Sequence, residues 1–193
     1  MNICVFGAAS NEIDNSYITA VEALGEEMAK RGHTLVFGAG GNGLMGAVAR
    51  GVHRGGSKII GVIPSFFKIE NVEKIFENCT ELIYTETMAQ RKAKMEDLAD
   101  AFIIVPGGIG TFEEFFEVLT LKQLCRHTKP IAIVDHRNYY KKLENFLDHS
   151  MQEGFVRDNC KKLYHYTTDH IDALRYIEDD QPIRQNVHDL KNG

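Results

Sequence analysis

The sequence predicts an α/β fold, a doubly wound, Rossmann-like parallel sheet of about seven strands flanked by helices. Short apolar runs alternate along the chain with segments of helical periodicity, and within each run nearly every residue is apolar. Near-continuous apolar strands separated by helices are typical of a parallel sheet covered on both faces. At 193 residues, with 44% hydrophobic content, the chain is long enough for one large core and short for two.

The predicted elements alternate in a regular order. The apolar runs predict strands at residues 2–6, 34–37, 58–63, 81–84, 101–105 and 130–134, with a weaker seventh at 163–166. The periodic segments predict helices at 17–31, 44–53, 87–99, 111–125, 139–152 and 168–177. We expect a single domain over residues 1–180 and a polar, aperiodic tail at 181–193. Ligands of such folds bind beyond the carboxyl ends of strands, so the loops after residues 6, 37 and 105 are the candidate binding loops.

Charge and composition narrow the class of partner. The formal net charge is −5 and no run of Lys or Arg stands out, which argues against a nucleic-acid partner. The N-terminus has no signal-peptide pattern and no apolar stretch approaches about 18 residues, so we expect a cytoplasmic protein without a membrane partner. The cysteines lie far apart, which indicates buried, reduced thiols rather than a disulfide framework or a zinc site: Cys4, Cys79, Cys125 and Cys160.

A glycine-rich turn between the fifth predicted strand and the following helix is the most informative motif. It reads Pro-Gly-Gly-Ile-Gly-Thr from Pro106 to Thr111. Glycines let backbone N–H groups approach a ligand, the Thr111 hydroxyl can cap the helix, and the helix dipole adds partial positive charge, so the turn predicts a phosphate site. Acidic residues follow in the first turn of the helix. We interpret Glu113 as an acid that favours the dipole, and Glu114 as a candidate reactive group.

A second glycine-rich loop follows residue 37 and formally satisfies G-x-G-x-x-G. Gly38, Gly40 and Gly43 are therefore possible walls of a nucleotide pocket, whereas close helix packing explains Gly46 equally well. A dinucleotide site also needs an acid about 20 positions on, and none occurs here until Glu70. Neither glycine loop contains the G-K-[ST] of a P-loop. We therefore expect neither NAD nor ATP hydrolysis, and no cofactor.

The predicted helix at 87–99 carries Met88, Arg91, Lys92 and Met95 on one face. The start of this helix is expected on the ligand side of the sheet. There the planar guanidinium group of Arg91 can donate hydrogen bonds to a phosphate, a ribose hydroxyl or a carboxylate. Lys92 is interpreted as a cation that extends to solvent.

Together these segments resemble the paired signature R-K…P-G-G-x-G-T-x-x-E of the LONELY GUY family, many bacterial members of which were misnamed lysine decarboxylases. The likeness also covers residues 5–10, 38–46, 61–64 and 153–156, hence nearly the whole chain. There are two departures from the family pattern. Ala8 and Ala9 stand where relatives often have Gly and Ser, and residues 65–80, which we expect to frame the base, have their own sequence.

The resemblance implies a phosphoribohydrolase that cleaves the N-glycosidic bond of an N6-modified adenosine 5′-monophosphate to free base and ribose 5-phosphate. By similarity Arg91 and Glu114 are the catalytic pair, with Glu114 stabilising an oxocarbenium-like ribose and orienting water. Substrate or phosphate contacts are implied for Lys92, Gly107, Gly108, Ile109, Gly110, Thr111, Glu113 and Thr120, with Met88 as a further possible pocket wall. Neither the physiological base nor the acid that protonates it follows from the sequence.

The resemblance further implies a homodimer with its active site near the interface. An unusually apolar surface over two helices points the same way, and its expected members are Met88, Met95, Phe112, Phe115, Phe116 and Leu119. We expect no metal site. An alternative from another class is a non-catalytic nucleotide or cofactor carrier on the same fold, although the presence of both Arg91 and Glu114 favours the enzyme.

Overall fold

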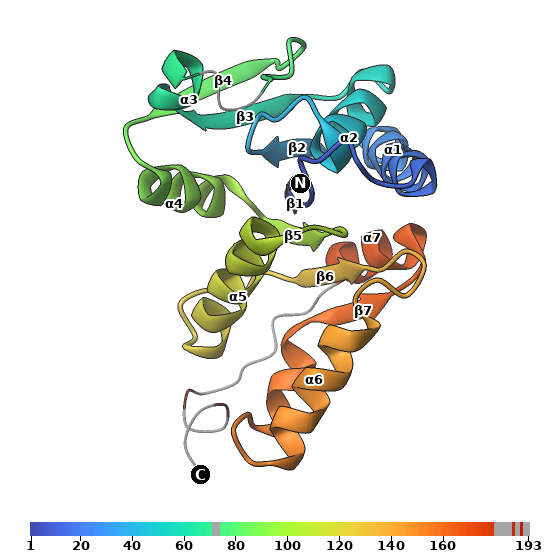
Figure 1. Cartoon of the computed structure of the whole chain (residues 1–193), viewed down its shortest axis with the longest axis vertical. Coiled ribbons are helices and arrows are strands. Elements are labelled where there is room, and N and C mark those ends of the chain that lie inside the picture. Colours follow the sequence, from blue (N-terminus) through green and yellow to red (C-terminus); the bar gives the residue numbers. More distant parts are fainter. Residues whose placement is uncertain (71–73, 180–186, 188–189, 191–193) are drawn as a thin grey trace.

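The computed structural model of the chain confirms the predicted fold class (Figure 1). It describes residues 1–70, 74–179, 187 and 190. One seven-stranded sheet runs in the order β4-β3-β2-β1-β5-β6-β7, and all neighbouring strands are parallel. The strands are β1 (Asn2–Phe6), β2 (Thr34–Phe37), β3 (Ile59–Pro64), β4 (Glu81–Thr85), β5 (Ala101–Ile104), β6 (Ile131–Val134) and β7 (His165–Thr167).

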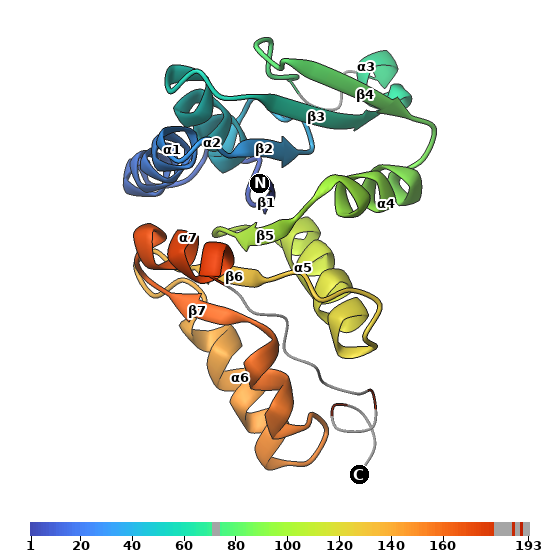
Figure 2. The same cartoon turned by 180° about the vertical axis from the view of Figure 1, so that it is seen from behind.

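Helices cover both faces of the sheet, as the views from opposite sides show (Figure 2). On one face lie α1 (Asn15–Lys30), α2 (Gly43–Arg54) and α7 (His170–Asp179). On the other face lie α4 (Met88–Leu98), α5 (Ile109–Gln123) and α6 (Lys141–Gln152). Two short helices complete the described chain, α3 (Ser65–Glu70) after β3 and the 3₁₀ helix η1 (Asp158–Leu163) before β7.

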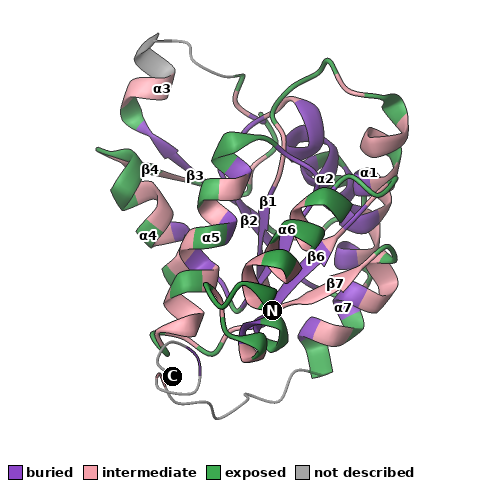
Figure 3. Cartoon of the chain, turned by 60° about the horizontal axis from the view of Figure 1, so that its bottom comes forward, coloured by how far each residue is buried: buried purple, intermediate pink, exposed green. Residues whose placement is uncertain are grey.

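The central strand β1 shows how the sheet divides the core. Ile3 and Val5 pack into the cluster under α1, α2 and α7, whereas Cys4 and Phe6 pack into the cluster under α4 and α5. Successive side chains of a strand point to opposite faces, so a strand covered on both sides has to be apolar throughout. Figure 3 shows the result, with buried strands in the middle and exposed residues along the outer sides of the helices.

The strand order places a topological switch point between β1 and β5. The chain winds outward from β1 to the edge strand β4, and α4 then returns across the sheet to β5 at its centre. The crossovers on either side of β1 therefore lead away in opposite directions. A crevice opens at such a point beyond the carboxyl ends of the strands, which is where the loops after β1, β2 and β5 meet.

The predicted strands and helices are confirmed, and their bounds agree with the structure to within two residues. Two short helices, α3 and η1, were not predicted because they lack the length to show a helical period. The predicted tail at 181–193 lies outside the described residues apart from Val187 and Leu190. Leu190 is buried in a small cluster with Cys160 and Leu163, which the polar composition of the tail did not indicate.

Several expected burial patterns need correction. Cys4 and Cys160 are buried free thiols, as predicted, but Cys79 is half-buried and Cys125 is exposed, since it lies in the turn after α5. Two side chains expected at an exposed apolar face, Met95 and Phe115, are instead fully buried because they point from α4 and α5 to the sheet. In the described ranges no helix is both long and apolar enough to cross a membrane.

Gly25 of α1 and Gly51 of α2 allow these helices to pack backbone against backbone. A Cβ atom added at Gly25 would lie 2.3 Å from the Val48 carbonyl oxygen, and one added at Gly51 would lie 2.2 Å from that of Glu22. Both neighbours are backbone atoms of regular helices, which cannot move individually.

We predict that Gly25→Ala lowers the free energy of unfolding by about 1–3 kcal/mol, despite the better helix propensity of alanine, because α1 and α2 must move apart. Urea denaturation measures the change. Thr19→Ala, on the exposed side of α1, is the control and should change the free energy by less than about 0.5 kcal/mol. An unchanged transition for Gly25→Ala would contradict the close packing.

Candidate active site

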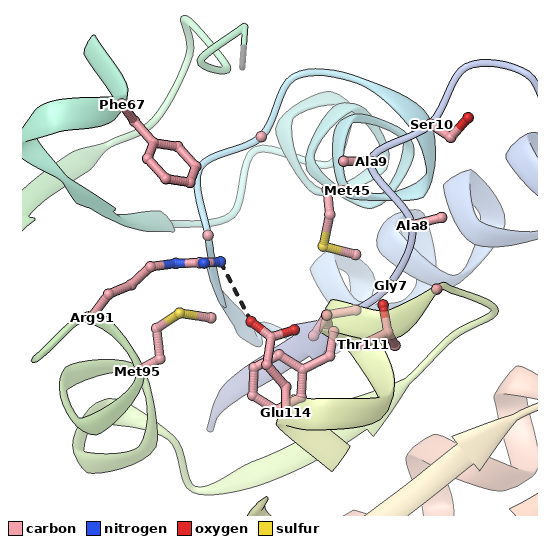
Figure 4. Close-up of a pocket in the computed structure, with 16 residues that line it drawn as sticks. Gly7, Ala8, Ala9, Ser10, Met45, Phe67, Arg91, Met95, Thr111 and Glu114 are labelled. Carbon is pink, nitrogen blue, oxygen red and sulfur yellow. Dashed lines mark hydrogen bonds and ion pairs between the residues drawn. The ribbon is translucent and has the colours of Figure 1, made fainter. Parts of the chain in front are cut away.

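A cavity of about 350 Å³ lies at the switch point, between the loops after β1 and β2, the helix α4 and the start of α5 (Figure 4). It contains only two ionisable side chains among its described lining residues, Arg91 and Glu114. The lining comprises Val5, Phe6, Gly7, Ala8, Ala9, Ser10, Gly38, Gly40, Met45, Phe67, Arg91, Met95, Gly108, Gly110, Thr111 and Glu114. The cavity thus brings together the two glycine-rich loops and the two residues implied as a catalytic pair.

The N-terminus of α5 opens into this cavity without a side-chain cap. The helix begins at Ile109 with Gly108 as its N-cap, two residues earlier than predicted. Thr111 is therefore inside the first turn, and the expectation that its hydroxyl caps the helix is wrong. Among the described residues, none accepts a hydrogen bond from the N–H groups of residues 108–111. These uncapped donors and the helix dipole form a site for an anion.

The turn needs glycine at these positions for different structural reasons. A Cβ atom added at Gly107 would lie 2.1 Å from the Thr111 hydroxyl oxygen, so Gly107 is required by close packing of the turn on the helix. Cβ atoms added at Gly108 or Gly110 would meet only open space. Gly108 and Gly110 therefore leave room for a ligand next to the backbone.

Arg91 enters the cavity from α4, one turn after the N-terminus of this helix. A capping box of Thr87 and Gln90 fixes where α4 begins. The guanidinium group lies across Gly38, where an added Cβ would come within 1.9 Å of Nη2. Its buried Nε has no hydrogen-bond partner in the described part of the chain. Gly38 is thus a true pocket wall, and Arg91 retains a donor for a ligand.

Glu114 faces Arg91 from the second turn of α5. The distance between Glu114 Oε1 and Arg91 Nη2 is 3.5 Å, and the two side chains are only 12% and 14% exposed. Burial raises the pKa of the Glu114 carboxyl to about 7, because desolvation outweighs the opposing effect of the Arg91 charge. Glu113 raises this pKa further. A carboxyl group with a pKa near neutrality can both accept and return a proton.

Glu113 and Lys92 form a separate cluster on the outer side of the same two helices. Lys92 Nζ makes an ion pair with Glu113 and lies 2.7 Å from Glu117 Oε2. The hydrogen bond to Glu113, followed by that to Glu117, raises the pKa of Lys92. Lys92 therefore holds α4 and α5 together instead of extending freely to solvent.

The other predicted contact residues lie around the cavity or further away. Gly43 begins α2 with a φ of +54° and packs on the backbone of the loop after β1, a conformation that favours glycine. Three more residues do not line the cavity in this unliganded chain. They are Met88, which is 38% exposed, Ile109, which is 87% exposed, and Thr120, which lies two turns further along α5.

Some lining residues were not among the predicted contacts. The loop after residue 6 was a candidate binding loop, but none of its residues from Gly7 to Ser10 was assigned a contact. Met45 and Phe67 had no assigned place at the site, and Met95 was expected in the apolar surface of its helix. Phe67 comes from the unpredicted helix α3. The only sequence signal for this helix was its position after a strand that ends at Pro64. Among the described residues, no group of three His, Cys, Asp or Glu side chains could hold a metal ion.

Comparisons with known proteins agree with this arrangement. Residues 45–177 match a protein family described as possible lysine decarboxylase. Two Arabidopsis thaliana proteins named cytokinin riboside 5′-monophosphate phosphoribohydrolase are similar to the chain. One is 40% identical over 83% of this chain and 75% of its own length, and the other is 38% identical over 96% and 85%. A rice protein named as a probable enzyme of the same kind is 38% identical over 98% of this chain and 76% of its own length.

Solved structures of low sequence identity share the fold. A molybdenum cofactor binding protein from Rippkaea orientalis superposes with a TM-score of 0.69 at 18% identity, over 92% of this chain and 94% of that one. The molybdenum cofactor carrier protein of Chlamydomonas reinhardtii gives a TM-score of 0.69 at 20% identity, over 92% and 95%. At these identities the likeness concerns the fold alone.

Fold and site define a Rossmann-like protein with an anion site at a helix N-terminus and an acid–arginine pair beside it. The family match and the relatives then settle the assignment. The chain belongs to the LONELY GUY family, as its motifs predicted.

Because the pKa of Glu114 is raised in the folded chain, the stability of the fold should depend on pH. Between the ordinary pKa of 4.5 and about 7 the folded chain holds a proton that the unfolded chain has lost, so the Glu114 carboxyl destabilises the fold as pH rises through this range. Glu114→Gln cannot acquire this charge. Relative to the native chain, we expect its free energy of unfolding to rise by on the order of 2–3 kcal/mol between about pH 4.5 and pH 8.

Urea denaturation of both proteins at several pH values measures this gain. Glu113→Gln, which makes the same side-chain change on the exposed side of the same helix turn, is the control for the substitution itself. Parallel stability curves for Glu114→Gln and the native chain would show that the carboxyl is well hydrated in the fold.

Proposed function

We propose that this protein hydrolyses the N-glycosidic bond of a nucleoside 5′-monophosphate, with an N6-modified adenosine 5′-monophosphate as the substrate class, to free base and ribose 5-phosphate. Water adds to C1′ of the ribose as the C1′–N bond breaks, and the base leaves with the bonding electron pair and takes up a proton. No net oxidation or reduction occurs, so the reaction needs no oxidant or reductant.

One observation carries the proposal: the Glu114 carboxyl shares a cavity with the uncapped N-terminus of α5 and lies 3.5 Å from Arg91. A site that only bound phosphate would not need a buried carboxylate close to the anion. Such a carboxylate suits a reaction in which positive charge develops on the adjacent sugar.

Glu114 is assigned two roles in the reaction. As a carboxylate it stabilises the oxocarbenium-like ribose and accepts a proton from the attacking water. It is the only carboxyl group among the described residues that line the cavity. Its pKa near 7 therefore makes it the group that can pass this proton on toward the departing base.

Arg91 positions the reacting groups. A guanidinium group does not release its proton in a protein, so acid catalysis is excluded for it. It orients Glu114 from one side, and its remaining donors can bind the ribose or the phosphate. The 5′-phosphate is assigned to the N–H groups of residues 108–111 at the start of α5.

The names of the relatives support a cytokinin riboside monophosphate as substrate. The carrier proteins of similar fold suggest the alternative, a protein that holds a nucleotide or cofactor without chemistry. Release of a free base distinguishes the two, since a carrier leaves its ligand intact.

We also propose that two copies associate through α4 and α5. Three apolar side chains on these helices remain accessible to solvent, Met88 at 38%, Phe116 at 37% and Ile109 at 87%. Exposed apolar groups gathered near a site are typical of an interface. Association there would place the mouth of the cavity next to the partner.

We predict that Glu114→Gln and Arg91→Met each lower turnover of the monophosphate by about 100-fold or more, the usual effect of losing a positioned acid–base or electrostatic group. Glu113→Gln, which alters the neighbouring carboxylate outside the cavity, should lose far less. Steady-state assays of base release compare the three variants. Near-normal release by folded Glu114→Gln would contradict the assignment.

We further predict that the protein cleaves the 5′-monophosphate but nearly ignores the corresponding nucleoside. Hydrogen bonds to a charged group contribute roughly 1.5–3 kcal/mol each, so loss of two lowers kcat/KM by about 100-fold to 10,000-fold. Chromatography of the products from AMP, an N6-prenylated AMP and adenosine tests the reaction and the phosphate dependence together. Equal cleavage of adenosine and AMP would show that the start of α5 does not bind the 5′-phosphate.

A further inference from the structure

Three consecutive carbonyl groups lie between β5 and α5, and each accepts a hydrogen bond from a different residue. The Tyr140 hydroxyl donates to the Val105 oxygen at 2.8 Å. The N–H of Ala8 donates to the Pro106 oxygen at 3.0 Å. The Tyr139 hydroxyl donates to the Gly107 oxygen at 2.6 Å. Two adjacent tyrosines and one backbone amide thus hold the whole segment between β5 and α5.

Holding these carbonyls also orients the N–H groups that follow them. In a planar trans peptide the C=O and the next N–H point in opposite directions. With the Gly107 oxygen directed at Tyr139, the N–H of Gly108 points away from Tyr139. The Gly108 oxygen in turn accepts from Phe112 as the first bond of α5. Gly108 lines the cavity, so the Tyr139 hydrogen bond sets the direction of a donor at the anion site.

The loop between β6 and α6 presents the two tyrosines in a fixed conformation. Asp135, only 1% exposed, accepts hydrogen bonds from the Tyr140 N–H at 3.1 Å and from the Tyr166 hydroxyl. Arg137 and Asn138 then adopt left-handed φ values of 58° and 59°, which are unusual for residues with side chains. A backbone held in this way by surrounding contacts is often found next to a functional site.

Further contacts fix the loop and the Tyr139 ring. Arg137 Nη1 lies 2.8 Å from Asp14 Oδ2, which ties the loop to the start of α1. The ring of Tyr139 packs edge-on against Tyr17 and against Tyr140. Burial raises the pKa of both Tyr139 and Tyr140, so their hydroxyls remain protonated donors across the physiological range.

We propose that Tyr139 and Tyr140 are positioning residues that hold the carbonyls of Gly107 and Val105, so that the N–H groups at the start of α5 point at the 5′-phosphate. The identity of this ligand rests on the proposed function. Neither tyrosine is assigned a contact with the reacting atoms, because neither lines the cavity that holds Arg91 and Glu114.

Tyr139→Phe is the decisive variant, because it removes one hydroxyl and keeps the ring, and because Tyr139 is 42% exposed and tolerates the change. We expect its Kd for AMP, measured by calorimetry, to rise about three- to ten-fold, the usual effect of one lost hydrogen bond. KM for the monophosphate should rise by the same factor with kcat changed less than about two-fold, and kcat/KM for adenosine should not change. In amide NMR spectra, AMP should shift the Gly108 signal less in the variant.

Tyr164→Phe is the matched control, since its ring packs on Phe115 in the core and does not line the cavity, and it should bind AMP like the native chain. Tyr140→Phe leaves a buried carbonyl without its donor, so lower thermal stability is expected together with weaker AMP binding. Native AMP affinity in folded Tyr139→Phe, or an equal loss in Tyr164→Phe, would overturn the proposal.

The proposed function and the positioning role fail in different ways. If the native chain binds AMP but releases no base, the hydrolase fails, while the calorimetric comparison of Tyr139→Phe with the native chain still decides the positioning role. If the native chain binds neither AMP nor ribose 5-phosphate, the turn is not an anion site and the positioning role is wrong as well.

Discussion

The Glu114 carboxyl group loses most of its hydration when the chain folds, and the surrounding arrangement follows from that loss. Among the described residues that line the cavity, Arg91 is the only cation, and its guanidinium group fits only because residue 38 has no side chain. The attraction is still too weak to restore an ordinary pKa. The result is a carboxyl group balanced between its two protonation states near neutral pH.

Much of the fold could be predicted because parallel strands and their covering helices have strong local patterns. The glycine turn was equally visible, since phosphate binding at a helix N-terminus needs glycines at fixed spacing. Contacts made by tertiary packing were not visible. The sequence separated Arg91, expected at the ligand, from its neighbour Lys92, expected to extend to solvent. It did not show that Lys92 pairs with acids of α5 instead.

The same limit explains the missed residues. Helix α3 has six residues, fewer than two turns, so its apolar positions show no period. Tyr139 and Tyr140 were included in a predicted helix that in fact begins at Lys141. They follow two left-handed residues, Arg137 and Asn138, and Arg137 is held by an ion pair with the distant Asp14. No local propensity predicts such a conformation for an arginine.

The crossover through α4 divides the cavity between two halves of the chain. The half that ends with β4 contributes uncharged groups only: the loop after β1, the glycines after β2, Met45 and Phe67. The half that begins with α4 contributes Arg91, Glu114 and the uncapped helix start. Chemistry and shape are therefore encoded in separate stretches of sequence. Under the proposed function, substitutions in the first stretch can change the shape of the cavity without changing Arg91 or Glu114, so selectivity can diverge in evolution while the proposed catalytic pair is inherited unchanged.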